Sequence, residues 1–148
     1  MAKFVLDTNV LIHAMRNEAA RDELAAWQRR MGPHLYMHAV VVAELLVGAG
    51  SEVTFERWRG HWLAPAERLG RVIAPTQGTW LRAARTVARL HGEGHLPRDQ
   101  VRPGFFNDCL LAASAVEQGF ILVTHHLADF HLIRRVLPGL RFESPLPS

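Results

Sequence analysis

FVLDTNVLI, residues 4–12, is the stretch that decides the fold, because one acidic residue interrupts an otherwise apolar run. Its first three residues have the composition of a short strand, and Thr8 or Asn9 can cap a following helix that extends to about Arg16. Burying the Asp7 carboxylate between these elements without a partner would cost several kcal/mol. Asp7 therefore requires hydrogen-bond donors, a bound cation or open solvent at the junction between strand and helix.

The same order of strand and helix continues along the chain. We predict further strands at residues 35–37, 71–74, 120–123 and 141–143, and further helices at residues 20–30, 39–47, 55–63, 76–92, 107–119 and 129–136. Strands that alternate with helices form a parallel sheet that is covered by helices on both faces. We therefore predict an α/β fold with a central parallel sheet, and ligands bind such sheets beyond the carboxyl ends of the strands.

Composition limits the class of protein. The chain has 148 residues, of which 49% are hydrophobic, so a single domain spanning residues 1–148 can bury a core. Cys109 is the only cysteine, which rules out an intramolecular disulfide and fits a reducing cytoplasm. The apolar runs are too short for a secretory signal or a membrane span, so we expect a cytoplasmic protein without membrane contact. The 17 basic residues exceed the 14 acidic ones, and all but Lys3 are arginine, which weakly favours an anionic partner such as nucleic acid.

Four acidic residues are expected to converge at the carboxyl edge of this sheet. Asp7 follows the first strand, Glu44 lies on the helix after the second strand, and Asp108 begins the helix before the fourth strand. Asp129 begins the last helix, and Thr124 ends the fourth strand. Packed carboxylates repel one another and take up protons unless a cation neutralises them, and Mg²⁺ or Mn²⁺ prefers oxygen ligands. Such a cluster typically cleaves phosphate esters, with metal ions that activate water and stabilise the leaving oxygen.

Each acid also has a purely structural interpretation. Asp7 stands where a helix begins and can act as its N-cap, and Asn107 or Asp108 can do the same for a later helix. Asp129 can simply begin the last helix. Glu44 is harder to explain in this way, because it lies in an apolar helix without a basic partner and Glu is almost never fully buried unless paired. Glu44 is therefore the strongest single indication of a functional site.

Three ordered segments also resemble the motifs of a known family. LDTNVLI, VVVAELLVGA and NDCLLAASAVEQGFILVTHHLADF are similar to successive motifs of PIN-domain ribonucleases, and within that family they resemble VapC-type toxins of toxin–antitoxin pairs. The resemblance implies metal-dependent cleavage of RNA, with Asp7, Glu44 and Asp108 as ligands of one or two Mg²⁺ or Mn²⁺ ions. It also implies an antitoxin whose disordered tail enters the acidic pocket, and a homodimer.

Further residues are assigned to the site around these three acids. Thr8, Asn9 and Thr124 can orient the carboxylates or metal-bound water. His126 stands where relatives often carry Asn or Asp, so it is either a substitute donor or a bystander. Asp129 keeps the acid that relatives place just before Phe, and we expect it to act as a fourth catalytic acid that contacts the metal from outside.

The basic and aromatic candidates keep two interpretations each. Three arginines either contact RNA phosphates or are ordinary solvated side chains: Arg16, Arg98 and Arg102. Three tryptophans either line a dimer interface or pack into the core: Trp58, Trp62 and Trp80. His38 stands where relatives often place the Ser or Thr cap of the middle helix, which we expect to affect stability more than activity.

The alternatives from other classes are weaker. The chain could be a catalytically silent RNA-binding scaffold, or a signalling module similar to response-regulator receivers, which also gather acids around Mg²⁺. A receiver needs a Lys at the end of a late strand, but the only lysine, Lys3, precedes the first strand. Zinc binding by His91 and His95 is disfavoured because glycines interrupt the helix there, and a buried Cys109 is more typical of a core residue than of a nucleophile.

Overall fold

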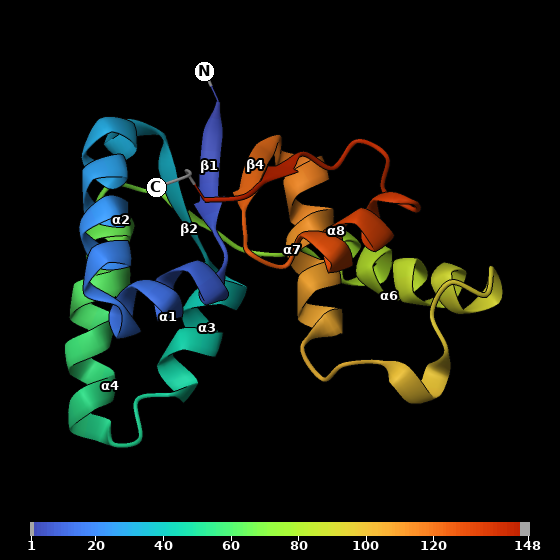
Figure 1. The fold of residues 1–148 in the computed structure, drawn as a ribbon, viewed down its shortest axis with the longest axis horizontal. Coiled ribbons are helices and arrows are strands. Elements are labelled where there is room, and N and C mark those ends of the chain that lie inside the picture. The colour runs from blue at the N-terminus through green and yellow to red at the C-terminus, as the bar shows by residue number, and fades with distance from the viewer. Residues whose placement is uncertain (1, 146–148) are drawn as a thin grey trace.

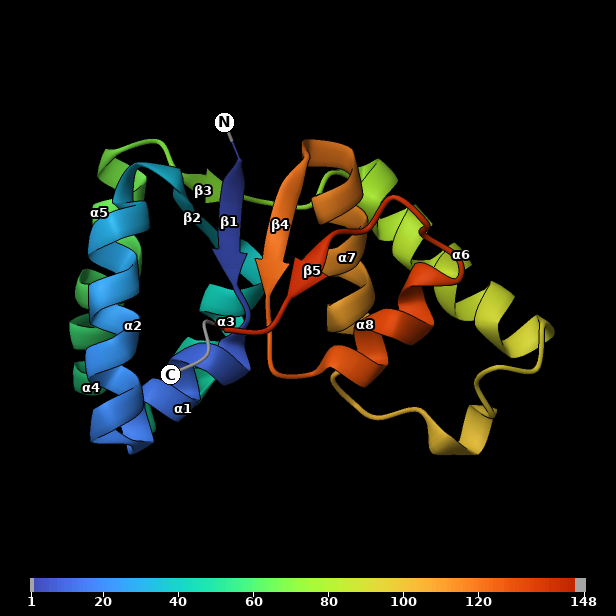
Figure 2. The same ribbon diagram turned by 45° about the horizontal axis from the view of Figure 1, so that its top comes forward.

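A five-stranded parallel sheet forms the centre of the molecule, and the computed structural model describes residues 2–145 of the chain (Figure 1). The strands are β1 (Lys3–Leu6), β2 (Leu35–His38), β3 (Val72–Ile73), β4 (Phe120–Val123) and β5 (Phe142–Glu143). Their order is β3-β2-β1-β4-β5, as Figure 2 shows. Phe4 of β1 pairs with Leu35 of β2 on one side and with Ile121 of β4 on the other. β1 is therefore the central strand, and the predicted α/β fold with a parallel sheet is confirmed.

Helices connect the strands. They are α1 (Thr8–Arg16), α2 (Glu18–Met31), α3 (Ala39–Val47), α4 (Glu52–Trp58), α5 (Ala64–Arg68), α6 (Gln77–Gly92), α7 (Phe105–Gln118) and α8 (Leu127–Arg134). A π-helical segment, Arg59–Leu63, joins α4 to α5, so the single helix predicted at 55–63 spans two elements. In Figures 1 and 2, α2, α4 and α5 lie on the side of β2 and β3, whereas α6, α7 and α8 lie on the side of β4 and β5. Within residues 2–145, no helix combines the length and the hydropathy needed to cross a bilayer.

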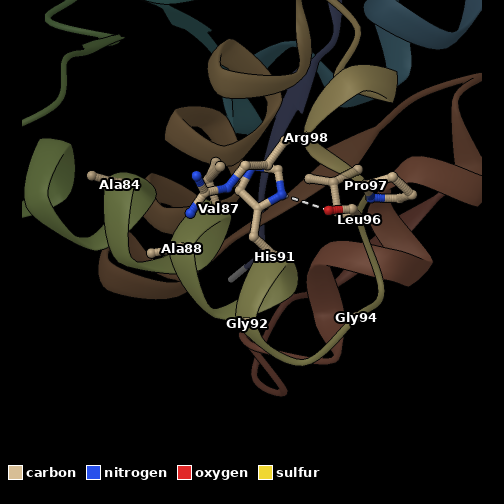
Figure 3. Close-up of a pocket in the computed structure, with 9 residues that line it drawn as sticks. All are labelled: Ala84, Val87, Ala88, His91, Gly92, Gly94, Leu96, Pro97 and Arg98. Carbon is tan, nitrogen blue, oxygen red and sulfur yellow. Dashed lines mark hydrogen bonds between the residues drawn. The ribbon is translucent and has the colours of Figure 1, made fainter.

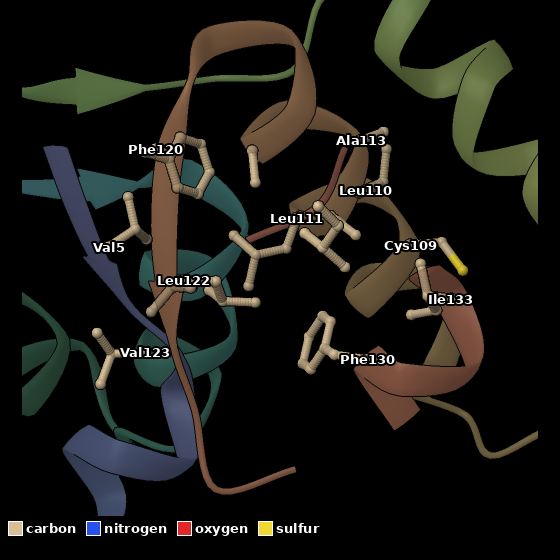
Figure 4. Packing of buried hydrophobic residues seen from close by; sticks show 14 of the residues in the cluster. Val5, Cys109, Leu110, Leu111, Ala113, Phe120, Leu122, Val123, Phe130 and Ile133 are labelled. Carbon is tan, nitrogen blue, oxygen red and sulfur yellow. The ribbon is translucent and has the colours of Figure 1, made fainter. Parts of the chain in front are cut away.

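Both faces of the sheet are covered. Val5 and Leu6 are both buried on β1, as are Leu122 and Val123 on β4. Because successive strand residues point to opposite faces, burial of both members of each pair requires packing on each face. Figure 4 shows this packing around β4, where Leu111 of α7 is directed toward the strand. The packed helices fix the position of the strand ends, at which the candidate site lies.

The start of α7 differs from the prediction. Gly104 is its N-cap and Phe105 its first residue, so the predicted capping role of Asn107 or Asp108 was wrong. The amide of Asp108 instead donates to the carbonyl oxygen of Gly104 at 3.1 Å, within the helix. Phe105 is only 2% exposed, and burial of its ring extends the helix upstream of the polar residues. The Asp108 carboxylate is consequently not used as a cap.

Two other helix starts also shift by a few residues. α8 begins at Leu127, which places Asp129 inside its first turn and not at its start. Asp7 is the N-cap of α1, so the expectation that Thr8 or Asn9 caps this helix was wrong and the alternative that named Asp7 was right. Thr8 and Asn9 belong to the first turn, where their side chains are available for other partners.

His38 performs the capping role for α3. Its Nδ1 accepts a hydrogen bond from the Val40 amide at 3.1 Å, as a Ser or Thr oxygen would at this position. The imidazole is fully buried, and this burial lowers the pKa of His38 to about 4. Its Nε2 has no hydrogen-bond partner among the described residues. His38 is therefore a neutral cap that leaves one buried nitrogen unpaired.

Candidate active site

Asp7 follows β1, and its carboxylate is held by three donors. Oδ1 accepts a hydrogen bond from the Thr8 amide, and Oδ2 accepts from Thr124 Oγ1 and from Asn9 Nδ2, each at 2.8 Å. Asp7 is only 3% exposed. Hydrogen-bond donors, and not open solvent, therefore compensate for the burial of this carboxylate. The same side chain caps α1 and presents an oriented oxygen at the carboxyl edge of the sheet.

Asn9 and Thr124 tie the ends of β1 and β4 together around this carboxylate. Asn9 Nδ2 also donates to Thr124 Oγ1 at 3.2 Å, and Asn9 Oδ1 accepts from the His125 amide at 2.8 Å. Thr124 Oγ1 in turn accepts from the His126 amide at 3.0 Å. Asn9 and Thr124 thus both donate to the same oxygen of Asp7 and are linked to each other. His126 joins it through its backbone, which leaves the imidazole ring free of this network.

Glu44 lies on α3 and reaches the same network through α1. Thr8 Oγ1 donates to Glu44 Oε1 at 3.0 Å. Burial raises the pKa of Glu44, the negative charge of Asp7 raises it further, and hydrogen bonds from Thr8 and Asn107 together with the positive charge of Arg102 oppose the shift. The sequence had suggested Asn107 only as a cap. Its effect on the pKa of Glu44 adds Asn107 to the surroundings of the site, and this has no signal in the sequence because it depends on how α7 packs beside α3.

Asp108 is the most perturbed acid of the cluster. It lies in the first turn of α7 and is only 5% exposed. Burial raises the pKa of Asp108 to about 7, and the charges of Asp7 and Asp129 add to this effect, while Arg102 opposes it. Arg102 Nη2 makes an ion pair with Asp108 and another with Asp129 at 3.0 Å. One arginine therefore bridges two of the predicted catalytic acids, but its positive charge does not cancel the rise in the pKa of Asp108.

The donor set fits a divalent cation. Three groups, from Asp108, His126 and Asp129, each offer one ligand atom, and these atoms all lie within 4.8 Å of one another. Of the predicted ligands Asp7, Glu44 and Asp108, only Asp108 belongs to this tight group. Asp7 nevertheless raises the pKa of both Glu44 and Asp108, so the acids share one electrostatic environment. Burial is the main cause of both raised pKa values, and an oxygen-binding divalent ion at this position would stabilise the ionised carboxylates.

The predicted RNA-binding arginines lie in three different settings. Arg102 is occupied by the acids, whereas Arg16 ends α1 and is exposed. Arg98 borders a cavity of about 590 Å³ at the end of α6, which Figure 3 shows. In that cavity the His91 ring contacts the carbonyl oxygen of Leu96 through Nδ1 at 2.5 Å. This contact anchors the start of the segment that leads to Arg102.

The competing chemistries do not fit the structure. Lys3 begins β1, at the opposite end of the strand from Asp7, and its Nζ lies 5.1 Å from the centre of the Tyr36 ring, so it does not play the part of a receiver lysine. Cys109 is fully buried, and burial raises the pKa of its thiol to about 12, which makes a thiolate nucleophile inaccessible. Nδ1 of His91 contacts the backbone carbonyl oxygen of Leu96.

The chain belongs to the PIN domain family, which matches residues 4–134. The match covers the sheet from β1 to β4 and all the acids described above. It confirms the resemblance stated from the three sequence motifs, and with it the expected fold.

Similar proteins include a ribonuclease and the solved structures of toxin–antitoxin assemblies. Ribonuclease VapC1 of Haemophilus influenzae (strain R2866) is 26% identical over 130 residues, which are 88% of this chain and 91% of that protein. The DNA-bound VapBC structure from Salmonella typhimurium has a chain that is 25% identical, with a TM-score of 0.72 over 99% of this chain and 100% of that chain. VapBC-1 from nontypeable Haemophilus influenzae has a chain with the same fold, at 24% identity and a TM-score of 0.63, covering 95% of this chain and 96% of that chain.

Proposed function

We propose that this protein is a metal-dependent endoribonuclease and the toxin of a toxin–antitoxin pair. The observation that carries the proposal is the shared environment of three buried or half-buried acids, in which the pKa values of Glu44 and Asp108 are raised and Asp7 is held by three donors. Membership of the PIN family and similarity to a ribonuclease support RNA as the substrate.

Asp7, Glu44 and Asp108 would hold one or two Mg²⁺ or Mn²⁺ ions, with Asp129 at the outer edge of the cluster. A bound ion of this kind supplies an activated water and stabilises charge on the scissile phosphate. The chain supplies orientation. Thr124 and Asn9 fix one oxygen of Asp7, and Thr8 fixes one oxygen of Glu44.

The substrate would approach from the carboxyl edge of the sheet, where the acids lie. Arg16 and Arg98 are the remaining candidates for phosphate contacts, since neither is paired with an acid in the ion pairs of the described residues. The formal net charge of +3 favours an anionic substrate. Contacts of this kind position a nucleic acid and carry little base specificity.

The partners follow from the similar assemblies. An antitoxin is supported by the VapBC complexes that share this fold, and we propose that its tail enters the acidic pocket. We also propose a homodimer within the cytoplasm, formed by a chain that is one domain over residues 1–148. Trp80 of α6 is 49% exposed and lies 6.0 Å, centre to centre, from the Phe106 ring. Trp62 packs against the core and Trp58 is half-buried, which leaves Trp80 as the tryptophan available to an interface.

Cleavage of labelled total RNA by purified, antitoxin-free protein tests the proposal. The reaction is run with Mg²⁺, with EDTA, and with the variant Glu44→Gln. Glu56→Gln, which changes an exposed acid on α4, is the matched control. We expect discrete cuts that require both the metal and Glu44. The Glu56→Gln variant should produce the same cuts as the wild type. Absence of cutting by folded protein, or cutting by Glu44→Gln at the normal rate, would instead favour a catalytically silent RNA-binding scaffold.

A further inference from the structure

Arg102 reaches the acidic cluster from a segment that belongs to neither neighbouring helix. Residues 93–104 connect α6 to α7 and contain two prolines and two glycines, with one short 3-10 turn. The Arg102 side chain is 42% exposed, whereas that of Asp108 is 7% exposed. A solvent-accessible arginine on a connecting segment thus supplies the positive charge for a buried acid.

The two ion pairs of Arg102 involve specific oxygens. Nη2 contacts Oδ2 of Asp108 and Oδ2 of Asp129, and one nitrogen therefore occupies the space between the two carboxylates. The His126 ring adds a third potential ligand within 4.8 Å of these acids. No other group of three acidic, histidine or cysteine ligands within that distance occurs among the described residues. The guanidinium thus stands where a small cation would bind.

We propose that Asp108, His126 and Asp129 form a cation site for which Arg102 and a divalent transition-metal ion compete, so that the ion binds by displacing Arg102. This inference rests on the proposed function, because it concerns the outer end of the same acidic cluster. It adds an imidazole ligand and an internal competitor to that cluster.

The imidazole determines the class of metal ion. Mg²⁺ is bound almost entirely through oxygen, whereas first-row transition metals also accept imidazole nitrogen. A set of two carboxylates and one imidazole therefore favours an ion such as Mn²⁺ over Mg²⁺. A site made of carboxylates alone would not favour Mn²⁺ over Mg²⁺ in this way.

Competition with Arg102 weakens the apparent metal affinity. A metal ion that binds only after the guanidinium has left has a reduced apparent affinity, because only a fraction of the molecules is in that state. Removing the guanidinium should therefore tighten binding, and metal binding should release the segment that carries it. Phe105 reports on this release, since its amide donates to the carbonyl oxygen of Arg102 at 2.9 Å.

Mn²⁺ binding to the full chain, without RNA, tests the affinity. Free Mn²⁺ is measured by electron paramagnetic resonance for the wild type, for Arg102→Gln and for Arg98→Gln, which removes the same charge four positions earlier on the same segment. We expect Arg102→Gln to lower the Kd roughly three- to tenfold and Arg98→Gln to change it less than twofold. His126→Ala should raise the Kd for Mn²⁺ and leave that for Mg²⁺ unchanged, with His125→Ala as its control.

Amide hydrogen exchange of Phe105 distinguishes displacement of Arg102 by Mn²⁺ from a simple electrostatic effect of the Arg102 charge on metal affinity. Saturating Mn²⁺ should speed exchange of this amide in the wild type, whereas in Arg102→Gln exchange should be fast already and insensitive to Mn²⁺. An unchanged Phe105 amide in the Mn²⁺-bound wild type, or equal Kd values for Arg102→Gln and Arg98→Gln, would overturn the displacement of Arg102. Binding of no Mn²⁺ at all would instead count against the metal-dependent function proposed above, so the two failures are distinguishable.

Discussion

The two ends of the acidic cluster are built in different ways. At the inner end, Asp7 is held by the Thr8 amide and the Asn9 side chain, both in the first turn of α1, and by the Thr124 hydroxyl just after β4. At the outer end, Asp108 is compensated by Arg102, which comes from the segment between α6 and α7 and is partly exposed. The inner end is therefore a fixed scaffold, and the outer end is held by a group that can leave.

The surroundings of the two buried carboxylates, Asp108 and Asp7, show the same difference. The pKa of Asp108 is raised to about 7 because burial outweighs the effect of its one basic neighbour. Asp7 is still less exposed, and its carboxylate accepts three directional hydrogen bonds. The two buried carboxylates therefore differ in the number and rigidity of their donors.

Loss of either acid should have the largest effect, and here the two ends are expected to behave alike. Asp7→Asn and Asp108→Asn should each reduce metal-dependent RNA cleavage by about 100-fold or more, because each removes a negatively charged ligand. The measurement is the initial rate of cleavage at saturating Mg²⁺. Asp22→Asn, an exposed position on α2, is the matched control. Activity retained in one of the two variants would remove that residue from the catalytic set.

The scaffold at the inner end can be tested without changing any charge. Thr124→Val removes the hydroxyl that donates to Asp7 Oδ2 and accepts from Asn9 and His126. Loss of a group that orients a metal ligand typically costs 10- to 100-fold in metal affinity or activity, and we expect an effect of about this size on metal affinity here. Thr86→Val, which removes another buried hydroxyl on α6, should leave metal affinity unchanged. An equal effect of both variants would indicate general loss of stability.

The alternation of strands and helices made the parallel sheet and its carboxyl edge predictable from the sequence. Asp7, Glu44 and Asp108 could be selected because each interrupts an apolar segment or follows a strand. Hydrophobic periodicity reports which elements are buried, and buried elements of this order have few possible arrangements.

The contacts that define the outer end were not predictable in the same way. Arg102 was one of two arginines in a polar segment, and its bridge between two acids depends on the path of that segment through space. The start of α7 was misjudged because capping preference is local, whereas burial of Phe105 is a tertiary effect. Asn107 was assigned to the cap for the same reason, and instead it opposes the rise in the pKa of Glu44.

An effect on stability, without direct involvement in metal binding, is expected at His38, which caps the helix that carries Glu44. The pKa of His38 is lowered to about 4 in the folded protein, below its ordinary value of 6.5, so the unfolded chain binds more protons between these values. Stability should therefore fall as the pH drops from about 6.5 to about 4, by up to roughly 3 kcal/mol. His38→Ser keeps a capping oxygen and should flatten this part of the pH profile, measured by urea unfolding.

The control for His38 is His61→Ser, which removes an exposed imidazole. Its pH profile should follow that of the wild type. A His38→Ser profile as steep as that of the wild type between pH 6.5 and 4 would show that other groups cause the acid sensitivity.

Unfolding of Asp7→Asn and Asp108→Asn at pH 8 in EDTA tests the contrast between the two ends most directly. Asp7→Asn places an amide donor against the donors that now hold the carboxylate, and we predict a loss of about 1–2 kcal/mol of stability. The pKa of Asp108 is raised in the folded protein, so the stability of the fold decreases as the pH rises from about 4 to about 7 and stays at the lower level above pH 7. Asp108→Asn should therefore be more stable than the wild type at pH 8, by roughly 1–3 kcal/mol. Shifts in the same direction for both variants would contradict the distinction between a fixed inner end and an exchangeable outer end.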